Sequence, residues 1–454
     1  MSARASALGA IVITAVCALP CAAQTVAAAP SAHTCDQKDA DAKRAWASSP
    51  HGWLASVFHK EQRDIADSWC RIWETSGGRD RSFKAENFGR TLFTGDGIHP
   101  AVSSALVPGS GFAGGATFGV DRALASRPLR LSMSADVLAS TNGSWQVGGE
   151  LAMLGSARKR DNDHNHAVVD VQHQHLAELT YFGPSNDSLK ANQTAYALDK
   201  TVAAGLAVIP LHHGVSAVFA GGGEWLDPGA PTAGSQLPVD ARFSEATTPA
   251  IGTSTSYFIY GAGVRWRYPL EPASEGYRSS AEALLRAYHA TSGGPYSFRR
   301  LDLLWTNAFT PNAAIGTFSA TGFAALSYTG DGDAVPFYLQ PTVGGTDQAG
   351  RAALRSYHDY RFRAPNALGI VIEHERAIKN VFGSLLFMDL GQVFDTPSRV
   401  RLNAFHKSFG AGITLRAGNT TVLRIFYAWG GGEGTRTTFS GGSGAFGPSD
   451  AIAW

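Results

Sequence analysis

The chain has 454 residues, a formal net charge of +1 and only 17% charged residues. This near-neutral balance gives no electrostatic footprint for a nucleic acid, so we expect no nucleic-acid partner. The charged fraction lies below the roughly 25% of an ordinary soluble domain. The 51 glycines and the 10% of aromatic residues suit many close-packed strands joined by turns.

Residues 1–23 have the pattern of a secretory signal peptide. Arg4 supplies a positive charge near the amino terminus, residues 8–19 form an apolar core, and two alanines at 22–23 offer a cleavage site. A membrane-anchoring helix is the alternative, but the apolar run is short for one. A lipoprotein signal ending at Cys21 fits less well, because a proline precedes that cysteine.

Residues 24–82 predict a short helical arm, which an exported barrel would hold in the periplasm. Apolar side chains recur there at helical spacing, in the runs Trp53, Leu54, Val57, Phe58 and Ile65, Trp69, Ile72. Proline at position 50 predicts a break, and Ser76-Gly77-Gly78 ends the segment. The arm could be a plain packing helix or a membrane-surface helix, and its mixed charge argues against the second.

Two cysteines remain after the signal peptide, Cys35 and Cys70. The periplasm is oxidising, so an even pair in an exported chain favours a disulfide. Such a bridge would close a loop around the helical arm and reduce the entropy of its unfolded state. Two free thiols are the alternative.

Residues 83–454 alternate between apolar and polar with a period of two, as in the stretches 129–139, 167–182, 257–268 and 405–416. In 167–182, for example, the alternation puts Val169, Val171, Leu179 and Tyr181 on one face. About 16 such segments fit, each long enough to cross a bilayer as a tilted strand. A soluble β-sandwich alternates similarly, but the signal peptide, segment length and low charge favour a membrane.

We therefore predict an all-β fold, a transmembrane antiparallel β-barrel of about 16 strands. We expect it to be closed and monomeric, since only a closed barrel satisfies every backbone group in lipid. The expected location is the outer membrane, in contact with its lipid.

Two short motifs follow each other late in the chain. Leu354-Arg355-Ser356-Tyr357 lies in a polar loop, and Phe387, Asp389 and Gly391 occupy alternate positions of a later strand. Together they resemble the barrel of the bacterial surface antigen superfamily, which includes the BamA and TamA assembly proteins and the transporters of two-partner secretion. In that family a long outer loop carries Val/Leu-Arg-Gly-Phe/Tyr, and the resemblance implies that it folds into the lumen, where its arginine meets acidic residues.

The chain departs from the family pattern at two places. Ser356 replaces the glycine of the loop motif and could change its backbone geometry, since glycine tolerates conformations that serine avoids. Residues 24–82 are too few for even one periplasmic POTRA module with linkers, so we expect a barrel-only member. Client capture through such modules is therefore not carried over.

Alternation gives an independent reason to expect a contact in the lumen. If Ile370 and Ile372 face lipid, then Glu373 and Glu375 face the lumen, and Asp389 and Gly391 do so on the next strand. We predict that Arg355 pairs with Asp389, with Glu373 nearby. The alternative is that these carboxylates simply line a wet pore.

Four histidines cluster at positions 164, 166, 173 and 175. A metal site is conceivable, but interfacial and loop histidines fit the pattern better, and we expect no cofactor. The leading functional hypothesis is insertion or translocation of an unfolded polypeptide client at the outer membrane. The alternative is a passive or gated pore. An enzyme is the third possibility, and the sequence has no phosphate-binding loop, nucleophile elbow or Cys-x-x-Cys pair to support it.

Overall fold

The computed structural model describes residues 97–103, 106–124, 129–155, 166–269, 275–347, 351–378, 382–417 and 420–441. The chain divides into two units, Met1–Arg81 and Ser82–Trp454, and every described residue belongs to the second. The expected signal peptide (1–23), the helical arm (24–82) and the pair Cys35 and Cys70 lie outside the described residues and stay predictions.

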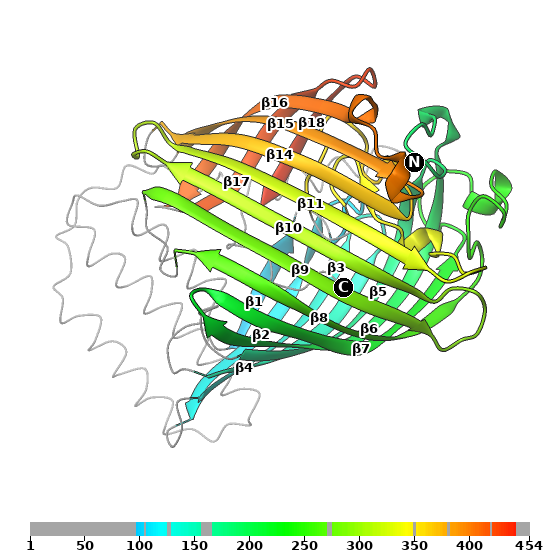
Figure 1. Cartoon of the computed structure of the whole chain (residues 1–454), viewed down its shortest axis with the longest axis horizontal. Helices are drawn as coiled ribbons and strands as arrows, with labels where there is room; N and C mark the ends of the chain where they lie inside the picture. Colours follow the sequence, from blue (N-terminus) through cyan, green and yellow to red (C-terminus); the bar gives the residue numbers. More distant parts are fainter. Residues whose placement is uncertain are drawn as a thin grey trace, which may run out of the picture. The chain divides into compact units, whose positions relative to one another are not determined.

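A single antiparallel sheet of sixteen strands forms the body of this unit, and each strand pairs with the next one in that sheet (Figure 1). The strands are β1 (Gly97–Ser103), β2 (Ala113–Leu124), β3 (Leu129–Ser140), β4 (Trp145–Leu154), β5 (His166–Tyr181), β6 (Thr194–His212), β7 (Val215–Gly229), β8 (Thr255–Tyr268), β9 (Gly276–Ala290), β10 (Phe298–Thr310), β11 (Thr317–Thr329), β14 (Asn366–Ala377), β15 (Phe382–Phe394), β16 (His406–Ala417), β17 (Thr420–Trp429) and β18 (Thr435–Gly441).

Two further strands, β12 (Thr342–Val343) and β13 (Phe362–Arg363), form a separate two-stranded sheet, so β14 follows β11 in the large sheet. Short 3₁₀ helices occur in the connections: η1 (Lys190–Asn192), η2 (Val239–Ala241), η3 (Phe337–Leu339), η4 (Pro397–Arg399) and η5 (Leu402–Ala404). Among the described residues no helix is long and apolar enough to cross a membrane. The all-β, antiparallel, sixteen-stranded prediction is confirmed for this part of the chain.

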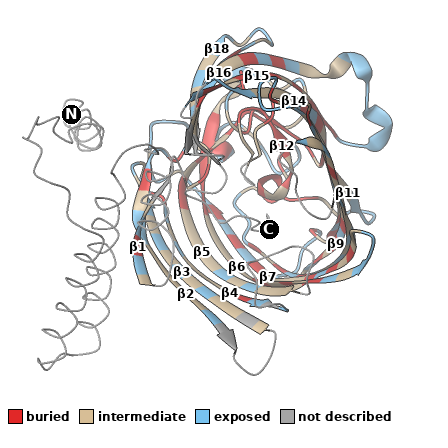
Figure 2. Cartoon of the chain, turned by 90° about the vertical axis from the view of Figure 1, so that its left-hand side faces the viewer, coloured by how far each residue is buried: buried red, intermediate tan, exposed pale blue. Residues whose placement is uncertain are grey.

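The sheet curls into a ring, seen end-on in Figure 2. Within the described residues, however, no pairing joins β1 to β18, so the expectation of a fully closed barrel is wrong for this structure. We call this break in the described pairing, between β1 and β18, the seam.

The outer wall is apolar, as a membrane-facing surface requires. Large side chains at alternate positions are about half exposed, among them Met133, Val137, Val169, Val171, Phe219, Tyr260, Val264, Trp305, Ile370, Ile372, Leu386 and Ile413. Such a band would be unfavourable in water because each Å² of apolar surface costs about 25 cal/mol there. The strands also have the length that crosses a bilayer at a tilt. The barrel is therefore transmembrane.

One strand differs from its simple period-two pattern. The pairing of β5 with β6 shifts between Leu176 and Leu179, which marks a bulge. Before the bulge Val169 and Val171 are exposed on the outer wall; after it Leu179 and Tyr181 are fully buried inside. The expectation that all four share a face is wrong, because one extra residue reverses the direction of every later side chain.

The interior is filled at one end by the connection between β11 and β14. Figure 2 shows β12, which belongs to this connection, inside the ring of strands. Phe337, Tyr338 and Tyr360 of the connection are buried in an aromatic cluster with Tyr181 and Tyr196 of the barrel wall. The rings of Tyr196 and Phe337 meet edge to face with centroids 4.8 Å apart, an arrangement that aromatic pairs prefer.

Candidate functional site

The loop between β12 and β13 presents Arg355 from a tight backbone turn. Leu354 adopts a left-handed φ of +56°, and the Tyr357 amide donates to the Leu354 carbonyl at 2.9 Å. The Gly345 amide also donates to this carbonyl, at 3.1 Å. A Cβ on Gly345 would lie 2.2 Å from the Asp359 Oδ1, so only glycine fits there. A left-handed leucine costs of order 1–3 kcal/mol and persists because its surroundings hold it.

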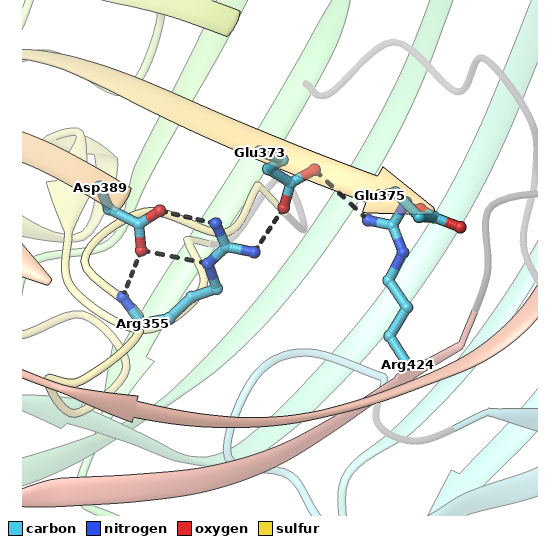
Figure 3. Close-up of polar contacts among 5 residues, drawn as sticks. All are labelled: Arg355, Glu373, Glu375, Asp389 and Arg424. Atoms are coloured by element: carbon cyan, nitrogen blue, oxygen red, sulfur yellow. Dashed lines mark hydrogen bonds and ion pairs between the residues drawn. The ribbon is translucent and has the colours of Figure 1, made fainter. Parts of the chain in front are cut away.

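Arg355 reaches two carboxylates on the lumenal side of the wall (Figure 3). Its Nη2 and Nε donate to the two oxygens of Asp389, at 2.6 and 3.1 Å, and its own backbone amide donates to the Asp389 Oδ2 at 2.9 Å. Its Nη1 donates to the Glu373 Oε1 at 2.5 Å. The side chains of Asp389 and Arg355 are 0% and 4% exposed, so this paired geometry operates almost without water.

Residues of the later strand motif shape the space around the guanidinium. The Arg355 Cζ lies 3.5 Å from the ring centroid of Phe387 and 5.5 Å from that of Phe426. A cation over an aromatic face is attracted by the ring quadrupole. A Cβ on Gly391 would lie 3.3 Å from Leu354 side-chain atoms, so the glycine allows the loop to approach the wall closely. All three positions of the Phe387, Asp389, Gly391 motif thus contact the loop turn.

Beyond Glu373, acidic and basic side chains continue to alternate along the lumenal face. The Glu373 Oε2 lies 3.8 Å from the Nη1 of Arg424 on β17, whose Nη2 donates to the Glu375 Oε2 at 3.0 Å (Figure 3). Burial lowers the pKa of the Arg355 guanidinium, but Asp389 and Glu373 outweigh it and raise that pKa above its ordinary value. Arg355 therefore stays charged. We call Arg355, Glu373 and Asp389 the lumenal triad.

Ser356 does not disturb the turn. The left-handed residue of the motif is Leu354, and Ser356 is not in that region, so the position needs no glycine. Its backbone amide donates to the Ser408 Oγ at 2.9 Å, and its own hydroxyl donates to the Gly430 carbonyl at 3.4 Å. Next to it, the Tyr357 ring packs edge to face on the rings of Phe362 and His406.

Further arginines of the same loop make contacts that the sequence did not indicate. Arg361 bonds the Glu433 Oε1 through Nε at 2.7 Å and the Ser188 hydroxyl through Nη1 at 2.8 Å. The backbone amide of Ser185 donates to the carbonyl of Arg363 at 2.8 Å. The loop is thereby attached to the β5–β6 connection as well as to β14 and β15. Since these contacts join residues far apart in the chain, no local spacing reveals them.

Of the clustered histidines, His173 and His175 lie on the outer wall near Trp145, whereas His166 has the opposite parity on β5 and is paired with the buried Val208. The His173 Nδ1 is 2.8 Å from the Thr201 Oγ1, and the His175 Nδ1 is 2.7 Å from the Asp199 Oδ1. The ring centroid of Trp145 is 5.1 Å from that of His173 and 6.2 Å from that of His175. This setting is that of interfacial residues of a barrel. His164 lies outside the described residues, and within them no three potential ligands gather as a metal site.

Comparisons with known proteins identify the type of barrel. No protein-family model matches the chain, and no curated protein matches it either. BamA from Haemophilus ducreyi, in a structure lacking POTRA domains 1–3, has a similar fold, with a TM-score of 0.52 and 13% identity over 76% of this chain and 69% of that one. The fold is thus that of a BamA-like barrel, as the motifs led us to expect.

Two weaker similarities are to CdiB proteins. CdiB from Acinetobacter baumannii has a TM-score of 0.43 and 10% identity, covering 76% of this chain and 58% of that one. CdiB from Escherichia coli has a TM-score of 0.45 and 10% identity, covering 75% and 62%. The chain therefore spans less than two thirds of either CdiB structure.

Proposed function

We propose that this protein is an outer-membrane barrel that inserts or translocates polypeptide, and that the lumenal triad holds its loop in the inactive, closed position. The observation that carries the proposal is the loop turn fixed inside the barrel by Arg355, which bonds Asp389 and Glu373 at once. A loop built only to line a pore has no need of a charged side chain that is 4% exposed. The BamA-like fold supports the same conclusion.

The seam supports a role with polypeptide rather than with small solutes. Strand edges that are not paired with each other present backbone donors and acceptors that can pair with another chain. In the described residues β1 and β18 are the two edges of the sheet, and neither pairs with the other. A client segment with period-two alternation could pair there and then enter lipid.

The lumenal triad supplies the control in this scheme. Displacing the loop leaves Asp389 buried without its cation, which costs several kcal/mol. The client must therefore supply that free energy, or a partner must. Under this proposal no metal or nucleotide takes part, the arm at 24–82 lies in the periplasm, and the working unit is one barrel in contact with outer-membrane lipid.

A depletion strain provides the direct test. We expect loss of the protein to reduce specific outer-membrane or secreted proteins in a quantitative proteome of the envelope, while small-solute uptake is retained. A matched strain carrying the wild-type gene should restore the profile. An unchanged proteome together with lost solute uptake would favour the pore alternative instead.

Conductance of the purified barrel in planar bilayers separates the same two functions. We expect wild-type protein to be mostly closed, with brief openings, because the loop occupies the lumen. A large conductance that persists in wild-type protein would contradict the proposal and favour the pore alternative.

A further inference from the structure

The outer wall has a groove over β8 to β11, four neighbouring strands in Figure 1. Its volume is about 440 Å³, and its lining is almost wholly apolar. Ala281 and Ala283 of β9 form its floor, while Trp266 of β8 and Trp305 of β10 form its sides. The groove lies on the membrane side, since Val264, Leu303 and Trp305 are among the exposed side chains of the outer wall.

Strand register explains the hollow. Trp266, Ala281 and Trp305 stand side by side across three strands, as do Val264, Ala283 and Leu303 in the next row. Each row therefore reads large, small, large. Adjacent strands are about 4.8 Å apart, so the large side chains of β8 and β10 stand on the order of 10 Å apart. That spacing leaves room for one extended hydrocarbon chain and not for a helix, whose diameter is about 10–12 Å.

The end of the groove nearest the short turns is marked by aromatic residues. Tyr268, Tyr277, Phe309 and Phe318 close β8 to β11 there, each about half exposed. Aromatic rings gather at the interface between lipid and water, so they place this end at the headgroup level. Short turns of outer-membrane barrels lie on the periplasmic side. The groove thus begins just inside the periplasmic leaflet.

A polar site lies between this aromatic row and the groove. The Tyr277 hydroxyl donates to the Asn307 Oδ1, and the Asn307 Nδ2 is buried without a partner. Ser279 stands directly opposite Asn307 in the strand register. An amide donor without an acceptor on a lipid-facing wall is costly. The ester carbonyl of a phospholipid lies at this depth, just below the headgroup, and can accept from the Asn307 amide once the side chain turns its buried Nδ2 outward.

We propose that the groove is a binding site for one phospholipid of the periplasmic leaflet. One acyl chain lies over Ala281 and Ala283 between the two tryptophans, and an ester carbonyl accepts from Asn307. A second copy of the chain fits less well, because β8 to β11 have both backbone edges paired and offer only a narrow apolar slot. The inference rests on the proposed membrane location, but not on the proposed handling of polypeptide.

Photolabelling tests the acyl-chain part. Purified full-length barrel is reconstituted in vesicles that contain a phosphatidylethanolamine with a diazirine in the middle of one acyl chain. After irradiation, peptide mapping should find the label concentrated on residues 281–283 and 303–305. Ala283→Trp fills the floor and should lower labelling there about tenfold, because excluding even two methylenes costs about that factor.

The matched control is Ala207→Trp, the same substitution at a small outer-wall position of β6, which should leave labelling of the groove unchanged. Heat-modifiable migration shows that both variants fold. Labelling spread evenly over the outer wall of all strands would overturn the proposal. So would crosslinks between groove residues of two copies, which would assign the groove to self-association.

Asn307→Leu tests the polar part. It keeps the apolar groove and removes the amide donor, so native mass spectrometry should find less phosphatidylethanolamine retained per barrel than with wild-type protein. Equal retention of lipid by the variant and the wild-type protein would show that Asn307 does not bind the lipid. Since none of these readouts depends on a client, failure here leaves the proposed transport function untouched, and failure of that function leaves the lipid site untouched.

Discussion

Two arginines of the connection between β11 and β14, Arg355 and Arg363 of β13, are buried in opposite ways. Taken as whole residues, Arg355 is 3% exposed and bonds two carboxylates, whereas Arg363 is 1% exposed and has no ion pair within the described part of the chain. Arg363 donates to the Phe337 carbonyl and the Tyr196 hydroxyl, and three rings surround its Cζ at 5.6 to 6.0 Å. Its Nε and Nη2 have no partner.

Arg355 therefore holds the loop through ion pairs, whereas Arg363 holds it through hydrogen bonds and packing against aromatic rings. The ion pairs of the triad need a defined geometry, and all of them involve Arg355. Moving Arg355 therefore breaks them together. The contacts of Arg363 are spread over several aromatic rings, so removing any one side chain leaves most of them in place. We therefore expect the triad to be the part that switches and the Arg363 cluster to be the part that persists.

The largest effect is expected from Arg355→Ala. It leaves the buried carboxylate of Asp389 without its partner, which typically costs about 3–5 kcal/mol. The loop should become sensitive to added protease, and brief openings in planar bilayers should become frequent. Arg355→Lys should recover only part of the effect, since lysine keeps the charge and lacks the planar fork. A protected loop in Arg355→Ala would contradict the assignment.

Asp389→Ala should lower the protease protection of the loop to a similar extent. The double variant, Arg355→Ala with Asp389→Ala, tests whether the two residues act through one contact. Because both single changes break the same contact, the combined loss should be much smaller than the sum of the two. Protease protection of the loop in the four proteins gives the coupling energy. Full additivity would mean that the two residues act separately.

Methionine substitutions compare the two arginines directly. An apolar residue of similar volume can replace a buried charge without loss when no opposite charge is left behind. Arg363→Met should therefore leave loop protection nearly unchanged, while Arg355→Met leaves Asp389 buried without a cation. Unfolding in denaturant, followed by heat-modifiable migration, measures both. Equal losses would show that the aromatic rings around Arg363 depend on its charge.

The smallest effect is expected from Phe387→Leu. It removes the ring that lies 3.5 Å from the Arg355 Cζ but keeps an apolar side chain. A cation over a desolvated aromatic face is worth about 0.5–2 kcal/mol. Loop protection should fall by that amount, and the same substitution at Phe382, which faces lipid on the same strand, is the control. A loss as large as that of Arg355→Ala would point to a packing defect.

The sequence was most informative where side-chain direction alone decides the contact. Glu373 and Asp389 could be assigned to the lumen because alternation leaves one choice per strand, and the loop motif then named Arg355. The role of the triad stays a proposal. The contact of Ser356 with Ser408 and the partners of Arg361 could not be anticipated, since they depend on how distant connections meet.

Two errors have the same origin. The bulge in β5 between Leu176 and Leu179 inserts one residue, and nothing in the apolar pattern marks it. Likewise, nothing in the alternation of β1 and β18 marks that the described residues leave these two strands unpaired with each other. Period-two patterns report which face a residue occupies, but pairing depends on register and strand length, which a local pattern does not contain.

The attachment of the loop at both ends has a mechanical consequence. Ser185 and Ser188 of the β5–β6 connection bond Arg363 and Arg361, while the triad bonds β14 and β15. Asn186 adds a further link, since its side-chain oxygen accepts from the Val393 amide at 3.0 Å. The loop therefore connects two parts of the wall, β5–β6 and β14–β15, across the lumen. In the described residues, strand pairing connects these parts only through β7 to β11. If a client separates the strands at the seam, as the proposed function requires, this brace would keep the curvature of the two arcs that it joins.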